Sequence, residues 1–171
     1  RYGNSANNTI TGTNQSGETL SGREGNDVLD GRSGSDRLLG GDGNDTLTFD
    51  SADTTIDGGK GVDTLKLSGN IDFSGLDQIS NFEQLDMSNN STADVLTVGF
   101  ADLFDLVGDN GLSGLFANSE EQAKVVVING DAEDTLILSG QDIRNQTPTK
   151  IDIDLYGDGN LYVLFQNTSL G

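Results

Sequence analysis

The sequence predicts an all-β chain: a coil of loops and short strands over residues 1–66, followed by a β-rich capping segment over residues 67–171. Two observations predict this fold. A nine-residue unit recurs through the first part, and alternating apolar positions recur through the second. We expect the two parts to form one continuous structural unit.

The repeat is a nonapeptide with the pattern GGxGxDx-apolar-x. From Gly22 to Lys66 the units are GREGNDVLD, GRSGSDRLL, GGDGNDTLT, FDSADTTID and GGKGVDTLK, with no slip in register. Two degenerate units precede them, GNSANNTIT (3–11) and the ten-residue GTNQSGETLS (12–21). Gly, Asn and Asp that only mark turns in a solvated segment would explain one such unit, but not five in register.

The chemistry of the unit predicts a loop followed by a minimal strand. Glycines permit positive φ, so six residues can turn back with their carbonyls facing one centre, while the aspartate adds a carboxylate. The central residue of the last three points inward. Two units then make one 18-residue coil, so the aspartate positions of alternate units stack along two edges of the roll. One edge carries Asn8, Asp27, Asp45 and Asp63; the other carries Glu18, Asp36 and Thr54.

Composition restricts what the loops can bind. The chain has 28 acidic and 9 basic residues, a net charge of −19, and neither Cys nor His. Nucleic acids and anionic membranes are therefore poor partners, and thiolate or imidazole ligands are excluded. The remaining oxygen ligands suit hard cations, above all Ca²⁺. The 33% hydrophobic content predicts a small core, and no apolar run reaches the length of a membrane span.

These repeats resemble the RTX family, the calcium-binding nonapeptide proteins of bacterial type I secretion. The resemblance implies a right-handed parallel β-roll, a solenoid that holds several Ca²⁺ ions. In that family each ion lies between loops 18 residues apart. It is held by both aspartate side chains, by the carbonyls of positions two and four below, and by those of positions one and three above.

Carried over to this chain, the resemblance implies three sites and one interruption. The Asp27–Asp45 pair is completed by the carbonyls of Arg23, Gly25, Gly40 and Asp42, and the Asp45–Asp63 pair by those of Gly41, Gly43, Gly58 and Lys60. The Glu18–Asp36 pair uses Asn14, Ser16, Gly31 and Ser33, and we expect it to be weaker because its lower unit lacks most glycines. Thr54 brings no charge, so an empty Asp36–Thr54 site is expected.

Echoes of the repeat persist after Lys66. NNSTADVLT (89–97) and NGDAEDTLI (129–137) keep the aspartate and the leucine but lose the glycines, which is typical of coil turns without calcium loops. A plain turn followed by a strand explains Asp94 and Asp134 equally well, so neither is predicted as a ligand.

The rest of the second part predicts a cap. QISNFEQLDMS (78–88) has the pattern of one strand with an irregularity, and GFADLFDLVG (99–108) that of a short helix with core-facing Phe100, Leu103, Phe104 and Val107. KIDIDLYGDGNLYVLFQ (150–166) predicts a hairpin about its GDGN turn. Together they form an irregular β-solenoid or β-sandwich-like segment that hides the last coil and its open edge.

This order of elements looks like the C-terminal region of large type I-secreted RTX adhesins. The resemblance implies a calcium-dependent folding module of a secreted, cell-surface protein, disordered without calcium and folding outside the cell. Its partners would be the secretion machinery and the rest of a larger secreted polypeptide. In that family the secretion signal lies at the extreme C-terminus, which places it either within residues 150–171 or beyond them. The start, RYGNSANNTI, is not a cleavable signal peptide and lies inside a degenerate repeat, so we expect a fragment of a longer protein.

Two other function classes remain open. A calcium-ordered surface could bind a glycan or peptide, although Tyr2, Tyr156 and Tyr162 without any Trp make a thin stacking platform. Paired carboxylates could in principle serve glycoside hydrolysis. The chain has no HExxH and no GxSxG, and acidic pairs are common here by chance, so we predict no catalysis.

Overall fold

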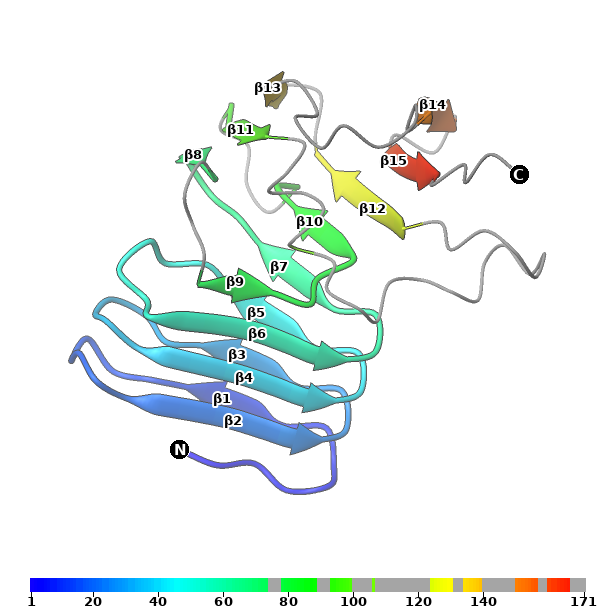
Figure 1. Ribbon diagram of the computed structural model, residues 1–171. Coiled ribbons are helices and arrows are strands. Elements are labelled where there is room, and N and C mark those ends of the chain that lie inside the picture. Colours follow the sequence, from blue (N-terminus) through cyan, green and yellow to red (C-terminus); the bar gives the residue numbers. More distant parts are fainter. Residues whose placement is uncertain are drawn as a thin grey trace.

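The chain forms a parallel β-solenoid of about 4 turns in a computed structural model (Figure 1). The structure describes residues 1–73, 78–88, 93–99, 106, 124–130, 134–139, 150–156 and 160–166. The strands stack one coil above the next from the N-terminus upward. The predicted all-β solenoid is confirmed.

Each coil of the first part adds one strand to each of two sheets, as the repeat predicts. The four-stranded sheet contains β2 (Thr19–Glu24), β4 (Arg37–Asp42), β6 (Thr55–Lys60) and β9 (Ile79–Ser80). The other sheet begins with β1 (Thr9–Thr11), β3 (Val28–Asp30), β5 (Thr46–Thr48) and β7 (Thr64–Lys66). Further strands of the second part extend this sheet to eight.

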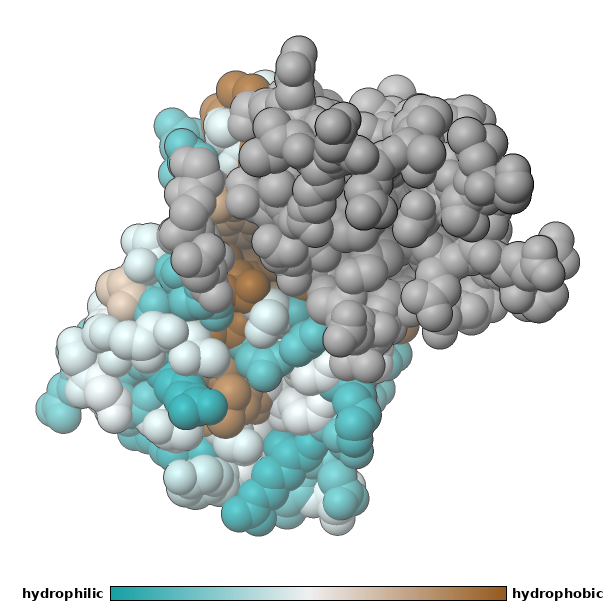
Figure 2. All heavy atoms as spheres, viewed as in Figure 1, coloured by the Kyte–Doolittle hydropathy of each residue, from teal (hydrophilic) through white to brown (hydrophobic). Residues whose placement is uncertain are grey.

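The core of the roll is one apolar residue per nonapeptide. Leu20, Leu38 and Ile56 are in register across β2, β4 and β6, while Leu29, Leu47 and Leu65 are in register across β3, β5 and β7. All six are fully buried. The residues beside them in the strands are at most half-buried, and the visible face of the roll is largely hydrophilic (Figure 2). Hydrophobic burial therefore stabilises only a narrow column.

The sheets continue past Lys66. β10 (Gln84–Asp86) pairs in parallel with β7, and β9 with β6; β10 in turn pairs with β12 (Lys124–Asn129). A third sheet consists of β8 (Asn70–Asp72), β11 (Val95–Gly99) and β13 (Thr135–Ser139), with Ile71, Leu96 and Leu136 in register. The two echoes of the repeat thus provide coil strands β11 and β13, as their pattern indicates.

Residues 78–88 form two strands and not the single irregular strand that the pattern predicts. β9 and β10 belong to different sheets, and Asn81 lies between them at φ 60°. A residue in the left-handed region turns the chain sharply, so this segment forms a corner of the coil. The apolar spacing still identifies the core, because Ile79, Phe82, Leu85 and Met87 are all buried.

The C-terminal hairpin is confirmed. β14 (Lys150–Tyr156) and β15 (Asn160–Gln166) are antiparallel, with Ile151 opposite Phe165 and Ile153 opposite Val163, and β15 pairs with β12. Of the predicted helix only Leu106 is described; it is helical and buried, whereas Phe100, Leu103, Phe104 and Val107 lie outside the described residues. Across the described ranges, no helix has the length and apolar character needed to cross a membrane.

Candidate metal centre

Acidic side chains stack along one edge of the roll, where each carboxylate bonds to the coil below. The backbone N–H of Asp27 donates to Oδ1 of Asp45 at 2.7 Å, and that of Asp45 donates to Oδ1 of Asp63 at 2.7 Å. The N–H of Asn8 likewise donates to Oδ1 of Asp27 at 2.6 Å. We call this stack the first ladder. It contains the residues that the repeat places on one edge.

One oxygen of each stacked aspartate remains open, on this edge and on the opposite edge of the roll. Oδ2 is buried and has no hydrogen-bond partner among the described residues in each of Asp27, Asp36, Asp45, Asp53 and Asp63. A buried, unpaired carboxylate oxygen is destabilising, since burial removes water without replacing it. A hard cation between the coils would satisfy these atoms, so the residues present fit Ca²⁺.

Position-one glycines line the space beside these oxygens. A Cβ at Gly22 would overlap both Oδ2 of Asp27 and the carbonyl oxygen of Gly40, and a Cβ at Gly40 would overlap Oδ2 of Asp45 and the carbonyl oxygen of Gly58. The structure therefore brings the predicted carbonyl ligands Gly40 and Gly58 close to the predicted carboxylates. Only glycine leaves this space open.

Positions two and four supply the other predicted carbonyls. Arg23 and Gly25 have φ values of 82° and 103°, and Gly41 and Gly43 have 122° and 136°. The carbonyl of Arg23 lies against Gly41, and that of Gly25 against Gly43, so both face the gap between coils.

The carbonyls at position three of the repeat already accept backbone hydrogen bonds. The carbonyl of Asp42 accepts the N–H of Gly25 at 2.9 Å, and the carbonyl of Lys60 accepts that of Gly43 at 2.8 Å. Among the described residues no three acidic side chains gather to hold a metal, so each candidate site combines a carboxylate pair with backbone carbonyls.

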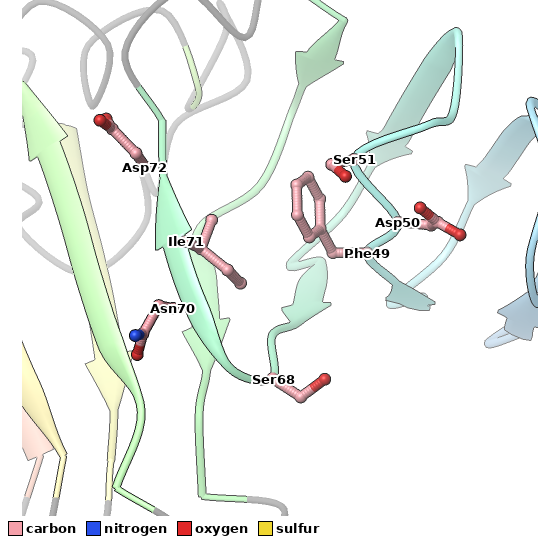
Figure 3. A pocket seen from close by; sticks show the side chains of 7 residues that line it. All are labelled: Phe49, Asp50, Ser51, Ser68, Asn70, Ile71 and Asp72. Carbon is pink, nitrogen blue, oxygen red and sulfur yellow. The ribbon is translucent and has the colours of Figure 1, made fainter.

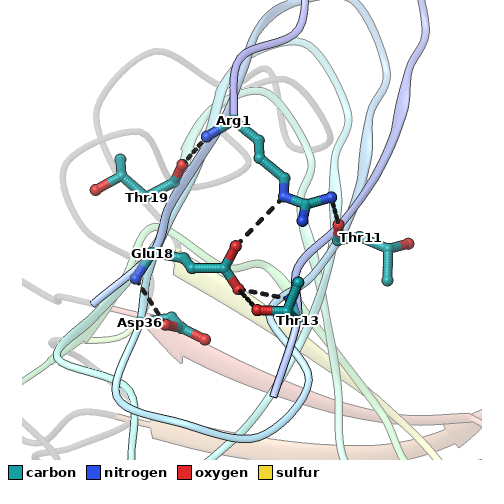
Figure 4. A network of polar contacts seen from close by, with 6 residues as sticks. All are labelled: Arg1, Thr11, Thr13, Glu18, Thr19 and Asp36. Carbon is teal, nitrogen blue, oxygen red and sulfur yellow. Dashed lines mark hydrogen bonds and ion pairs between the residues drawn. The ribbon is translucent and has the colours of Figure 1, made fainter. Parts of the chain in front are cut away.

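The Glu18–Asp36 pair differs from the first ladder. The N–H of Glu18 donates to Oδ1 of Asp36 at 2.9 Å, but the Glu18 carboxylate is turned back toward its own loop (Figure 4). It accepts the N–H and the hydroxyl of Thr13 at 2.5 and 2.7 Å, and the Nε of Arg1 at 3.3 Å. The hydrogen bonds from Thr13 lower the pKa of Glu18. Both carboxylate oxygens of Glu18 therefore accept hydrogen bonds, whereas Oδ2 of the stacked aspartates accepts none among the described residues.

The ten-residue unit also shifts the carbonyls below Asp36. Gly34 faces the carbonyl of Gln15, the residue before the predicted Ser16, while the Ser33 hydroxyl lies 3.4 Å from Oδ1 of Asn14. The carbonyl of Gly31 faces Gly12, where a Cβ would also approach the Glu18 carboxylate. The predicted carbonyls thus lie beside the gap below Asp36, but their register differs from that of the first ladder.

The assignment of Thr54 to the aspartate position is wrong. The N–H of Asp36 donates to Oδ1 of Asp53 at 2.9 Å, and Asp53 is buried. The Thr54 hydroxyl instead donates to the carbonyl of Asp36 at 2.8 Å. The stack Glu18, Asp36 and Asp53, which we call the second ladder, is therefore acidic throughout.

The upper end of the first ladder is Glu83, which the nonapeptide pattern does not predict. The N–H of Asp63 donates to Oε2 of Glu83 at 2.9 Å, and Glu83 is buried. The signal was present, since Glu83 precedes buried Leu85 by two residues, as Asp63 precedes Leu65. Asp94 follows the same rule before Leu96. Its N–H donates to Oδ1 of Asp134 at 3.0 Å, so both aspartates occupy ladder positions.

Burial raises the pKa values of three aspartates, Asp45, Asp53 and Asp63. It raises the pKa of Asp45 to about 6, with a further contribution from Asp27, and that of Asp53 to about 6. The pKa of Asp63 rises to about 7, through burial first and then the charges of Asp45 and Glu83. Each shift shows that the buried charged form lacks compensation, which a bound cation would provide.

Comparison with known proteins agrees with this geometry. Residues 13–47 match the RTX calcium-binding nonapeptide repeat, in 4 copies. No curated protein and no solved structure matched the chain. The repeat family binds calcium ions, and its β-roll is a structural, non-catalytic fold. Residues 13–47 are therefore similar to the calcium-binding structural repeat of RTX proteins.

Proposed function

We propose that this module couples calcium binding to folding in a secreted, adhesin-like RTX protein. It stays unfolded in the cytosol and folds outside the cell after type I secretion. The observation that carries the proposal is the set of five buried aspartate oxygens without a partner among the described residues. A fold that buries uncompensated charge needs its cation in order to form.

The energetic balance favours an unfolded chain when calcium is scarce. The chain carries a net charge of −19, and the roll buries one apolar residue per nonapeptide. So small a core offsets little of the chain entropy lost on folding, and the stacked carboxylates repel one another. Calcium at the ~10⁻⁴–10⁻³ M that suits weak extracellular modules would turn binding energy into folding energy.

Folding beyond the membrane would support export and surface placement. A chain that folds only outside cannot slide back through a narrow transporter. We propose that residues 1–66 are the calcium-dependent part and residues 67–171 the cap packed on it. The continuous pairing of β7 with β10 supports this arrangement, because the cap extends the same sheet.

Circular dichroism of the full chain tests the proposal. We expect little β signal in chelator and a strong β signal in millimolar Ca²⁺, with Mg²⁺ as the control cation. An unchanged, folded β spectrum in chelator would overturn it. A secretion assay of the parent protein, with and without residues 67–171, then tests the link to export.

A pocket between β5 and β8 favours a second candidate function, the recognition of a glycan or peptide. Its volume is about 300 Å³, and Phe49 and Ile71 face one another across it (Figure 3). Asp50, Ser51 and Asn70 add polar groups to the lining. A single ring beside hydrogen-bonding groups offers a sugar one stacking face and several polar contacts. A glycan array on the calcium-loaded chain tests this, with Phe49→Ala as the variant that should lose any binding.

A further inference from the structure

We propose that Asp36 and Asp53 hold a calcium ion between two coils of the second ladder, where the repeat motif itself supplies no aspartate. The site lies partly outside the matched residues 13–47. The proposal rests on calcium binding by the roll and adds a ligand that the motif does not predict.

Asp53 occupies the same place relative to the coil below as the aspartates of the first ladder. Its Oδ1 accepts the N–H of Asp36 at 2.9 Å, as Oδ1 of Asp45 accepts that of Asp27 at 2.7 Å. The sequence separation is 17 residues in the first case and 18 in the second. The carboxylate has kept its spatial position although its residue has moved by one.

Both carboxylates present an open, buried oxygen. Asp36 is 1% exposed and Asp53 is 4% exposed, and Oδ2 of each lacks a hydrogen-bond partner in the part of the chain described. The two ion pairs found among the described residues, Arg1–Glu18 and Lys60–Asp42, include neither. Two buried carboxylates in adjacent coils need a cation, and an all-oxygen site suits Ca²⁺.

The shift has a local cause. Unit 49–57 keeps nine residues, but one fewer precedes the aspartate and one more follows it. The shorter turn is closed by Asp50, whose carbonyl accepts the N–H of Asp53 at 3.1 Å. The additional residue is Thr54. Its N–H and its hydroxyl both donate to the carbonyl of Asp36, each at 2.8 Å.

The lower half of the site keeps the backbone of the first ladder. Arg32 and Gly34 have φ values of 66° and 135°, matching the positive φ of Arg23 and Gly25 at the same positions. Only the upper half is new. The site therefore combines the same backbone turn below with a shifted carboxylate above.

Native mass spectrometry of the full chain at saturating Ca²⁺ tests the proposal. Asp53→Asn keeps the Oδ1 acceptor but removes the charge, and we expect it to bind one ion fewer than wild type. Asp50→Asn removes a charge from the same turn, and Thr54→Val removes the hydroxyl at the motif position. Both should keep the wild-type count. An unchanged count for Asp53→Asn, or an ion lost by Thr54→Val, would overturn the proposal.

Asp45→Asn, measured in parallel, separates this proposal from the proposed function. A wild-type chain that binds no calcium refutes both. Loss of ions in Asp45→Asn without loss in Asp53→Asn refutes only the Asp53 site. Crystals of the wild-type chain grown in Ca²⁺ provide a test that needs no variant. An anomalous peak bonded to Oδ2 of Asp36 and Asp53 supports the site, and a water at that position contradicts it.

Discussion

The backbone N–H of Asp45 donates to Oδ1 of Asp63 at 2.7 Å, and Oδ2 of both residues is buried without a partner among the described residues. One oxygen of each ladder aspartate thus holds adjacent coils together, and the other faces the gap where a cation would bind. Structural and metal-binding roles are therefore combined in one carboxylate.

Asp45 should matter more to calcium-dependent folding than Asp36. Asp45 belongs to two aspartate pairs of the first ladder. Asp36 also belongs to two pairs, but only the one with Asp53 has an open partner, because the carboxylate of Glu18 is already held by Thr13. We expect Asp45→Ala to raise the calcium midpoint of folding more than Asp36→Ala, measured by circular dichroism during calcium titration. The reverse order would contradict the pairing of loops proposed here.

Glycines facing a carbonyl should tolerate no side chain. Gly41 has φ 122°, and a Cβ there would overlap the carbonyl of Arg23. Gly69 also has positive φ, 82°, but a Cβ there would meet nothing within 4 Å. We expect Gly69→Ala to cost roughly 1–2 kcal/mol from backbone strain alone. Gly41→Ala should cost more and shift the calcium midpoint, as measured by denaturation at fixed Ca²⁺; equal losses would contradict the close approach.

The narrow core should respond strongly to truncation. Leu29 is fully buried in β3, while its neighbour Val28 is 43% exposed. Leu29→Ala should lower the free energy of unfolding by about 2–5 kcal/mol in saturating calcium. Val28→Ala is the matched control and should change it by less than about 1 kcal/mol. Urea denaturation measures the free energy of unfolding of both variants. Similar losses would show that the inward-facing leucines do not form the core.

Protons should partly replace calcium in chelator. Burial raises the pKa values of Asp45 and Asp63 from the ordinary 3.8 to about 6 and about 7. The folded form therefore binds protons more tightly than the unfolded chain, so this contribution to stability is complete below pH 3.8 and is lost as pH rises through 6–7. We expect more β signal at pH 5 than at pH 8 in chelator.

Asp63→Asn provides the control for the pH experiment, because the amide side chain that replaces the carboxyl group is neutral at every pH. The variant should show a smaller difference in β signal between pH 5 and pH 8 than wild type. A β signal that grows with pH in the absence of calcium would contradict the raised pKa values.

A spacing rule explains how far the sequence could predict the site. An acidic residue two positions before a buried apolar residue marks a ladder position at Asp45 and Asp63, and also at Glu83 and Asp94. The rule would have found Glu83, which the nonapeptide pattern missed. It fails at Asp53, which lies three residues before Ile56, because the turn there is one residue shorter.

The sequence by itself determined the coil, its core column and the chemistry of its ligands. A strict nonapeptide period with one apolar residue per unit has few other ways to be buried, and a chain without Cys or His can offer only oxygen. Tertiary structure decided which oxygens remain open. Stacking of the coils directs Oδ1 of Asp53 to the N–H of Asp36, draws Thr54 onto a carbonyl, and turns residues 78–88 at Asn81. These outcomes depend on contacts between coils, which no local pattern contains.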